Sequence, residues 1–204
     1  MKECGAGPNF WYKEPDSGSA QGPFTPTPMP AVSEKVRPTG IARPFAEHEI
    51  IVSKTDLKGH ITYANDVFIR VSGFEESELL GKPHAIIRHP DMPRAVFKVL
   101  WDTVEAGREI FAYVNNMARN GDHYWVLAHV TPSFAQDGRI VGYHSNRRVP
   151  DARALRVVMP LYERLREVER QHSDRRDGLT ASLALLEGEL AKAGLSYAEW
   201  IWTL

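Results

Sequence analysis

Two glycine-containing dipeptides, Asn120-Gly121 and Asp137-Gly138, constrain the fold of this 204-residue chain more than any other feature. Both are preferred sequences for tight turns between antiparallel strands. Segments rich in β-branched and aromatic residues flank each turn, as expected of strands. We therefore predict three consecutive antiparallel strands over residues 109–118, 122–134 and 139–149. A sheet of this kind leaves one face free to form a pocket with helices.

Shorter elements precede these strands. We predict strands over 49–54 and 60–63, and helices over 65–71, 75–80 and 94–105. The last helix has the clearest signal, because Val96, Leu100 and Val104 recur at fourfold spacing and Gly107 follows its end. The segment 82–93 is interpreted as a linker. The predicted fold class is α+β: a five-stranded antiparallel sheet with short helices on one face, plus C-terminal amphipathic helices.

Three regions are predicted along the chain: a flexible proline-rich arm over 1–44, a compact sensory domain over 45–150 and a helical tail over 151–204. The aromatic residues of the arm either cluster locally or cap the domain; they are Phe10, Trp11 and Tyr12. The tail carries two apolar stripes separated by a turn over 173–178. The stripes are Leu155, Val158, Tyr162 and Leu165, then Leu179, Leu183, Leu186 and Leu190. They favour a homodimer over a monomer whose tail completes its own core.

Composition excludes several partners and compartments. A net charge of −1, from 25 basic and 26 acidic residues, predicts no non-specific binding of nucleic acid. Cys4 is the only cysteine, so neither a disulfide nor a cysteine-built metal site is expected. The N-terminus has no apolar signal segment, and no uncharged apolar run approaches the roughly 20 residues that span a membrane. We expect a cytoplasmic protein without direct membrane insertion.

Motifs for enzymatic chemistry are absent from the sequence. There is no phosphate-binding loop, nucleophile elbow or kinase signature, and the eight histidines show no zinc-protease spacing. His84 and His89 alone are a weak metal signal. We therefore predict no enzyme activity, no catalytic residues and no metal site.

Three segments carry a resemblance to a known family. Residues 56–66 read DLKGHITYAND, residues 88–93 read RHPDMP and residues 120–126 read NGDHYWV. The first, with the order of elements, resembles the opening of a PAS domain. The other two, about thirty residues apart, resemble the PAS domain of bacterial aerotaxis receptors. The resemblance covers roughly residues 48–150.

The resemblance implies non-covalent binding of FAD and the reporting of redox state to a signalling partner. Eight residues match positions that contact the cofactor or are critical for function in that family: Asn65, Arg88, His89, Asp91, Phe97, Trp101, Asn116 and Tyr124. The sequence departs from its relatives at Ile110 and at Met117-Ala118. Neither a haem ligand on the helix 94–105 nor the cysteine of a light-sensing flavin domain is present.

Six of these residues also have an ordinary structural interpretation. Arg88 suits a phosphate or carboxylate but could form a salt bridge, and His89 could bond to backbone. Asp91 precedes a helix that it could cap. Phe97 and Trp101 could be core, while Asn116 could be an amide satisfied by backbone.

The predicted function is a cytoplasmic redox or oxygen sensor that acts in trans on a chemoreceptor, a kinase or another signalling protein. The alternative is a cofactor-free PAS module for protein interaction or dimerisation. A flavin-dependent oxidoreductase is a third class, but the sequence offers no candidate substrate or nicotinamide site.

Overall fold

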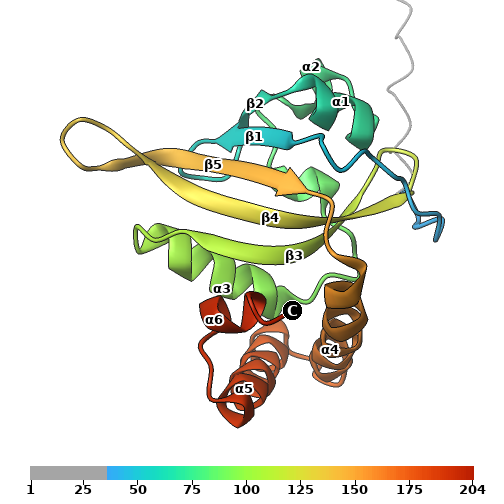
Figure 1. Cartoon of the computed structure of the whole chain (residues 1–204), viewed down its shortest axis with the longest axis vertical. Helices are drawn as coiled ribbons and strands as arrows, with labels where there is room; N and C mark the ends of the chain where they lie inside the picture. The colour runs from blue at the N-terminus through green and yellow to red at the C-terminus, as the bar shows by residue number, and fades with distance from the viewer. Residues whose placement is uncertain (1–35) are drawn as a thin grey trace, which may run out of the picture. The chain divides into compact units, whose positions relative to one another are not determined.

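The computed structural model describes residues 36–204. Five strands form one antiparallel sheet in the order β2-β1-β5-β4-β3 (Figure 1). They are β1 (Ile51–Thr55), β2 (Ile61–Ala64), β3 (Ile110–Met117), β4 (His123–Phe134) and β5 (Ile140–Arg148). The predicted α+β class with a five-stranded antiparallel sheet is confirmed, as are the two tight turns, where Gly121 and Gly138 have positive φ.

The helices are α1 (Asp66–Ser72), α2 (Glu76–Leu79), α3 (Arg94–Glu105), α4 (Ala152–Arg170), α5 (Arg175–Ala193) and α6 (Tyr197–Ile201), with a 3₁₀ helix, η1 (His84–Ile87). The short elements η1 and α6 were not predicted, because they are too short to show a helical period. The predicted turn over 173–178 is too long. Asp174 caps α5 by accepting from the N–H groups of Arg176 and Asp177, so the helix starts at Arg175.

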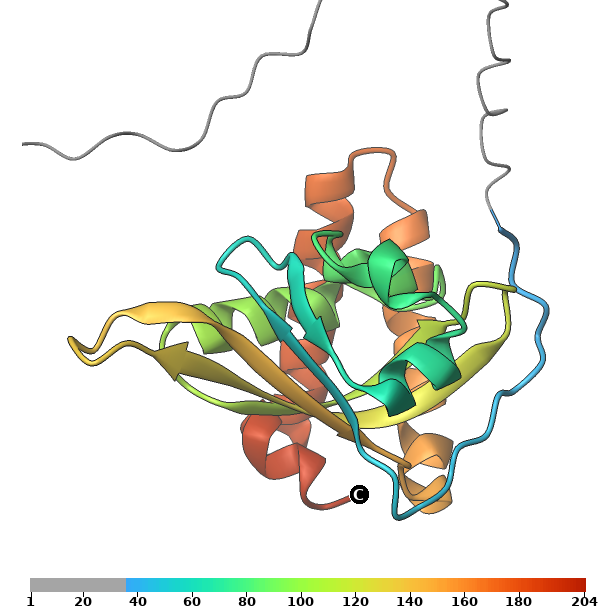
Figure 2. The same cartoon turned by 90° about the horizontal axis from the view of Figure 1, so that it is seen from above.

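Strand register assigns side chains to the two faces of the sheet. Asn116 lies opposite Tyr124, and Val114 lies opposite Val126, so the alternation predicted for β3 and β4 is confirmed. On β5, Ser145 lies opposite Ser53 of β1 and Val130 of β4. These residues belong to the inner face. Figure 2 shows α1, α2, η1 and α3 on one side of the sheet.

The tail helices cover the outer face of β3 and β4. The Trp125 ring lies 6.1 Å from that of Tyr162 in α4, and the Tyr162 hydroxyl donates to the Tyr113 carbonyl oxygen at 2.8 Å. Val158 and Leu165 are fully buried. Much of the first predicted stripe is therefore buried within the same chain, as in the monomeric alternative.

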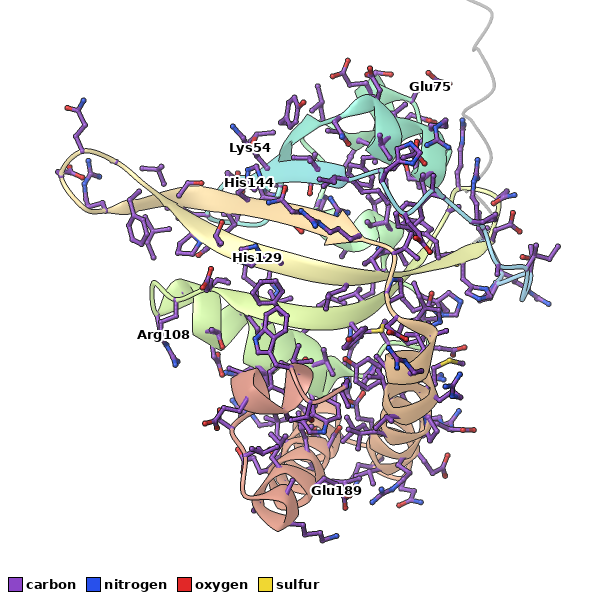
Figure 3. All side chains as sticks on the ribbon, in the orientation of Figure 1. Lys54, Glu75, Arg108, His129, His144 and Glu189 are labelled. Atoms are coloured by element: carbon purple, nitrogen blue, oxygen red, sulfur yellow. The ribbon has the colours of Figure 1, made fainter. Side chains whose placement is uncertain are left out.

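The outer face of β1 and β5 is more open. Figure 3 labels Lys54 on β1 and His144 on β5. Glu189, labelled in the same view, lies on α5, away from the sheet. Lys54 is exposed, and its ammonium lies 5.9 Å from the Tyr63 ring centroid. No helix within residues 36–204 combines the length and apolar character that a membrane span requires.

Part of the predicted arm pairs with the sheet. Thr39 N–H donates to the Gly121 carbonyl, and backbone bonds join Ile41 and Arg43 to His123. A Cβ on residue 121 would lie 2.2 Å from the Arg37 carbonyl oxygen, so glycine is needed there for close approach as well as for the turn. The first 35 residues, including the aromatic residues of the arm, lie outside the described residues.

Two neighbouring valines of α4 test whether the tail is part of the core. Val158 is fully buried, whereas Val157 is 50% exposed. We expect Val158→Ala to lower the free energy of unfolding by about 2 kcal/mol, through lost burial and an unfilled cavity. Val157→Ala serves as the matched control and should change it by less than about 0.5 kcal/mol. Urea denaturation measures both, and equal effects would contradict the packing of α4.

Candidate functional site

A cavity of about 190 Å³ lies between the inner face of the sheet, α3 and η1. Its floor comes from β1, β3, β4 and β5, and its walls from α3 and the segment 83–88. The floor residues include Ser53, Thr55, Val114, Asn116, Ala128, Val130, Tyr143, Ser145 and Arg147. The wall residues include His84, Arg88, Phe97, Leu100 and Trp101.

Most of the lining is apolar or aromatic. Phe97 and Trp101 lie one helical turn apart on α3, and the Trp101 ring meets that of Tyr143 edge-on at 5.4 Å. Val114 and Ala128 supply small side chains on the sheet. Such a surface suits a planar apolar ring system, with polar groups needed only at a few points.

Among the charged residues of the lining, Arg147 is the most deeply buried. Its side chain is 2% exposed, with one guanidinium nitrogen donating to Ser53 Oγ and the guanidinium carbon 4.5 Å from the Phe68 ring centroid. Nε and Nη1 have no hydrogen-bond partner within residues 36–204. Burial lowers the pKa of Arg147 to about 10, so the side chain is still charged at neutral pH.

Two further buried polar atoms in the cavity lining have no partner within the described part of the chain. They are the amide nitrogen of Asn116 and the hydroxyl oxygen of Thr55. An unpaired buried donor costs about 1–3 kcal/mol, and an unpaired buried charge costs more. These atoms and Arg147 therefore favour a ligand that presents hydrogen-bond acceptors.

His84 lies on the wall of the cavity, where its Nε2 is 3.1 Å from Ser53 Oγ. Ser53 thus contacts both His84 and Arg147. Burial, and then the positive charge of Arg147, lower the pKa of His84 to about 3. The imidazole is therefore neutral at physiological pH.

Arg88 is held at the cavity by contacts of both its backbone and its side chain. An isolated antiparallel bridge joins its backbone to that of Asn116, which brings the RHPDMP segment against β3. Its guanidinium carbon lies 4.0 Å from the Phe97 ring centroid, and Nη2 donates to the Met92 carbonyl at 3.4 Å. Burial lowers the pKa of Arg88, although the charge of Glu169 opposes this shift.

Four of the eight residues predicted from the sequence line the cavity together: Arg88, Phe97, Trp101 and Asn116. They come from three separate segments, and the fold brings them to one place. Their roles toward a cofactor remain predictions.

The other four lie outside the cavity lining. Asn65 caps α1 by accepting from Phe68 N–H, and it also bonds to the backbone at Val52 of β1 and at Ile50, just before that strand. Its carbonyl and amide groups thus have backbone partners in the fold.

The remaining three residues outside the cavity lining are His89, Asp91 and Tyr124. His89 is buried and its Nδ1 accepts from Asp91 N–H, while Asp91 pairs with Arg166 of α4 at 2.6 Å instead of capping α3. Burial lowers the pKa of His89. Tyr124 lies opposite Asn116, with a hydroxyl that has no partner within residues 36–204; burial raises its pKa.

Sequence reasoning missed Arg147, His84 and Thr55 as lining residues. A signal for Arg147 was available, because strand alternation places it on the same face as Tyr143 and Ser145. A charge on the inner face of a predicted strand is unusual enough to suggest a site. His84 had no such signal, since it lies in the segment interpreted as a linker.

Residues 61–147 match the family model described as the PAS fold. This part of the chain has the PAS fold. Over 122 residues the sequence is 43% identical to the aerotaxis receptor of Escherichia coli (strain K12), an alignment that covers 60% of this chain and 24% of the receptor. The resemblance inferred from the sequence motifs is thereby confirmed.

More distant relatives include the nitrogen fixation regulatory protein of Klebsiella pneumoniae, 28% identical over 99 residues, which cover 48% of this chain and 20% of that protein. The chain thus spans about a quarter or less of the length of these curated relatives. Among solved structures, the dark structure of the blue-light photoreceptor Aureochrome1 LOV aligns with a TM-score of 0.49 at 22% identity, covering 54% of this chain and 82% of that chain.

The depressed pKa of His84 predicts acid sensitivity. Between the ordinary histidine value and about 3, the unfolded chain binds a proton that the folded chain does not, so stability falls as the pH falls. From about pH 7 to about pH 5, this pKa difference lowers the free energy of unfolding by at most about 2 kcal/mol. The His84 side chain is only partly buried, so the expected loss lies below this limit. We expect His84→Gln to lose that part of the decline in urea denaturation at the two pH values. His172→Gln, at an exposed position, is the control; an unchanged acid decline in His84→Gln would contradict the assignment.

Proposed function

We propose that the PAS domain binds FAD non-covalently in this cavity and acts as a redox sensor. The observation that carries the proposal is the buried guanidinium of Arg147, with two nitrogens unpartnered at an otherwise largely apolar cavity. A buried charge of this kind needs a compensating group. The resemblance to aerotaxis receptors supplies the candidate.

The lining residues fit a flavin. The ring system of a flavin is planar and largely apolar, which matches Phe97, Trp101 and Val114, and one edge carries carbonyl oxygens and ring nitrogens. Arg147, Asn116 and Thr55 present donors for such an edge. Arg88 has a fixed cationic fork suited to a phosphate group.

A bound flavin changes charge and protonation when it is reduced. The side chain of Asn116 can respond, because its amide presents either an N–H or an oxygen to a neighbouring atom. Arg147 is a fixed cation that favours negative charge beside it. A ligand shifts the conformation of a protein only by interacting differently with its two states, and these residues provide the differential contacts.

The output of this domain is proposed to act in trans, on a chemoreceptor or another signalling protein in the cytoplasm. Support comes from the relatives, whose names are those of a receptor and a regulatory protein. The balanced charge of the chain is consistent with a protein partner rather than nucleic acid.

A homodimer through the tail helices stays a prediction. Fewer apolar side chains of the tail are available for a dimer contact than the sequence suggests, because Val158 and Leu165 are buried within the chain. The apolar side chains still exposed on the tail are Val157, Met159 and Trp202. Light scattering on the full chain distinguishes the dimer from a 23.0 kDa monomer.

Two adjacent arginines at the end of β5 test the FAD proposal. Arg147 is buried at the cavity, whereas Arg148 is exposed. We expect Arg147→Met to weaken FAD binding about 10- to 100-fold, the usual effect of losing a charge-assisted hydrogen bond. Asn116→Ala and Arg88→Ala should weaken it in the same direction. Calorimetric titration with FAD measures all of these affinities.

Arg148→Met is the matched control and should bind FAD like the parent protein. Circular dichroism establishes that each variant is folded. Equal affinity in the parent, Arg147→Met and Asn116→Ala would overturn the residue assignment, and no FAD binding by the parent would overturn the function itself.

A further inference from the structure

One face of α4 contacts three separate elements that surround the cavity. Tyr162 donates to the carbonyl of Tyr113 on β3, and Arg166 pairs with Asp91 in the segment before α3. Glu169 binds the first residues of α3. The spacing of four and three residues between Tyr162, Arg166 and Glu169 places them on the same side of the helix.

Glu169 supplies the cap that the local sequence of α3 lacks. The N-cap residue of α3 is Pro93, which has no side-chain donor or acceptor, and the first turn contains no acidic residue. Glu169 Oε1 accepts from the backbone N–H groups of Arg94 at 2.7 Å and Ala95 at 3.1 Å. Because the carboxylate is largely buried, these bonds are shielded from water.

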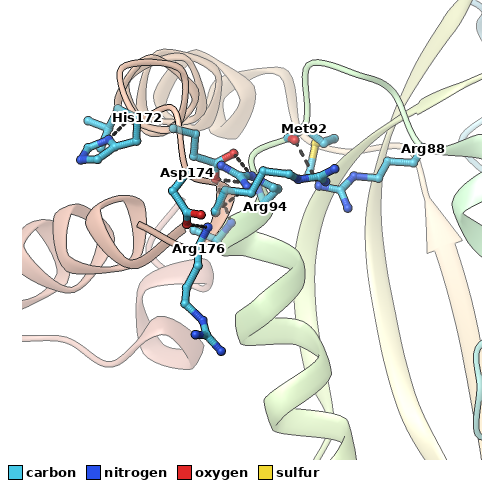
Figure 4. Close-up of polar contacts among 10 residues, drawn as sticks. Arg88, Met92, Arg94, His172, Asp174 and Arg176 are labelled. Atoms are coloured by element: carbon cyan, nitrogen blue, oxygen red, sulfur yellow. Dashed lines mark hydrogen bonds and ion pairs between the residues drawn. The ribbon is translucent and has the colours of Figure 1, made fainter. Parts of the chain in front are cut away.

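The same contact extends to α5. Glu169 Oε2 accepts from Arg94 Nε at 3.0 Å, and Arg94 Nη1 donates to the carbonyl of Arg175 at 2.6 Å. Figure 4 shows Arg94 between the start of α3 and the turn that joins α4 to α5, with Arg88 on the side of the sheet. The junction therefore joins three helices through one carboxylate and one guanidinium.

Gly178 shows how closely α5 approaches this junction. A Cβ on residue 178 would lie 2.8 Å from the Glu169 carbonyl oxygen and 2.9 Å from Arg94 Nη2. Glycine is unfavourable inside a helix by about 1 kcal/mol relative to alanine. The close approach accounts for it here.

Arg88 and Phe97, which lie on either side of the start of α3 in the sequence, also line the cavity. Arg88 contacts the Met92 carbonyl and the Phe97 ring, so any ligand group that draws Arg88 toward the cavity alters contacts at the start of α3. The charge of Glu169 also acts on Arg88 directly. Arg88 thus contacts residues around the start of α3 from the side of the cavity, and Glu169 contacts the start of α3 from the side of the tail.

We propose that ligand binding in the cavity alters the tail hairpin α4–α5 through Glu169, which acts as a positioning residue at the start of α3. This coupling rests on the proposed FAD function. It goes beyond that function because it names the contact by which ligand in the cavity alters the tail. Such a contact transmits a change only if it differs between the ligand-free and the ligand-bound protein.

Hydrogen exchange of the full chain, with and without added FAD, tests the coupling. In the parent, FAD should slow exchange both at the start of α3, over residues 92–97, and at the α4–α5 junction, over residues 163–180. We expect about a 5-fold or larger change at the junction, the usual size of coupling between sites. In Glu169→Gln the change over 92–97 should persist while the change over 163–180 falls below about 2-fold.

Two further variants complete the design. Glu167→Gln is the matched control, because Glu167 is exposed and its side-chain partners within residues 36–204 belong to its own helix end, Arg170 and Gln171. It should behave like the parent. Gly178→Ala should lose the response at the junction while keeping Glu169, which distinguishes loss of contact from loss of charge.

Bound FAD without any change over 163–180 in the parent would overturn the coupling and leave the FAD function intact. A full response in Glu169→Gln and Gly178→Ala would also overturn it. Absence of FAD binding, seen in the absorbance of the same samples, would overturn both the function and the coupling.

Discussion

The β3–β4–β5 unit has to be covered on both faces, and the rest of the structure follows from that requirement. Apolar side chains alternate along β3 and β4, with Val114 and Val126 on the inner face and Tyr113 and Trp125 on the outer face. A sheet that is apolar on both sides is stable only when both sides are removed from water. Helices from before the hairpins cover the inner face, and helices from after them cover the outer face.

The two covers differ in how completely they pack. On the outer face, the α4 side chains Val158, Tyr162 and Leu165 are buried. On the inner face, α3 and η1 leave a cavity, with the charge of Arg147 beside it. Protein interiors rarely contain a cavity of this size together with an unpaired charge. This combination supports the proposal that the inner face is the ligand-binding side, whereas the outer face is covered by helices that also contact α3.

Features set by local chemistry could be predicted from the sequence. The glycine turns, the capping of α1 by Asn65 and the fourfold spacing on α3 each depend on a few neighbouring residues. Four of the eight residues predicted from the family resemblance also line the cavity: Arg88, Phe97, Trp101 and Asn116. Of these, Arg88 lies in a quoted motif, and the other three lie elsewhere in the region that the resemblance covers.

Features that depend on long-range contacts could not be predicted. The capping of α3 by Glu169 joins residues 75 positions apart, and the role of Asp91 in binding Arg166 reverses the local expectation of a helix cap. Asn65 has the polarity of a cofactor contact, but the backbone groups of Ile50, Val52 and Phe68 bind its side chain. Only the three-dimensional arrangement shows which polar atoms remain unpaired, and those of Arg147 carry the functional proposal.

The absorption spectrum of the freshly purified chain tests the central claim most directly. If Arg147 and Asn116 hold a flavin, the protein should show two flavin bands, and heat denaturation should release FAD from it. A single intense Soret band would mean a haem instead. A colourless protein that takes up no FAD on reconstitution would contradict the account and favour a cofactor-free interaction module.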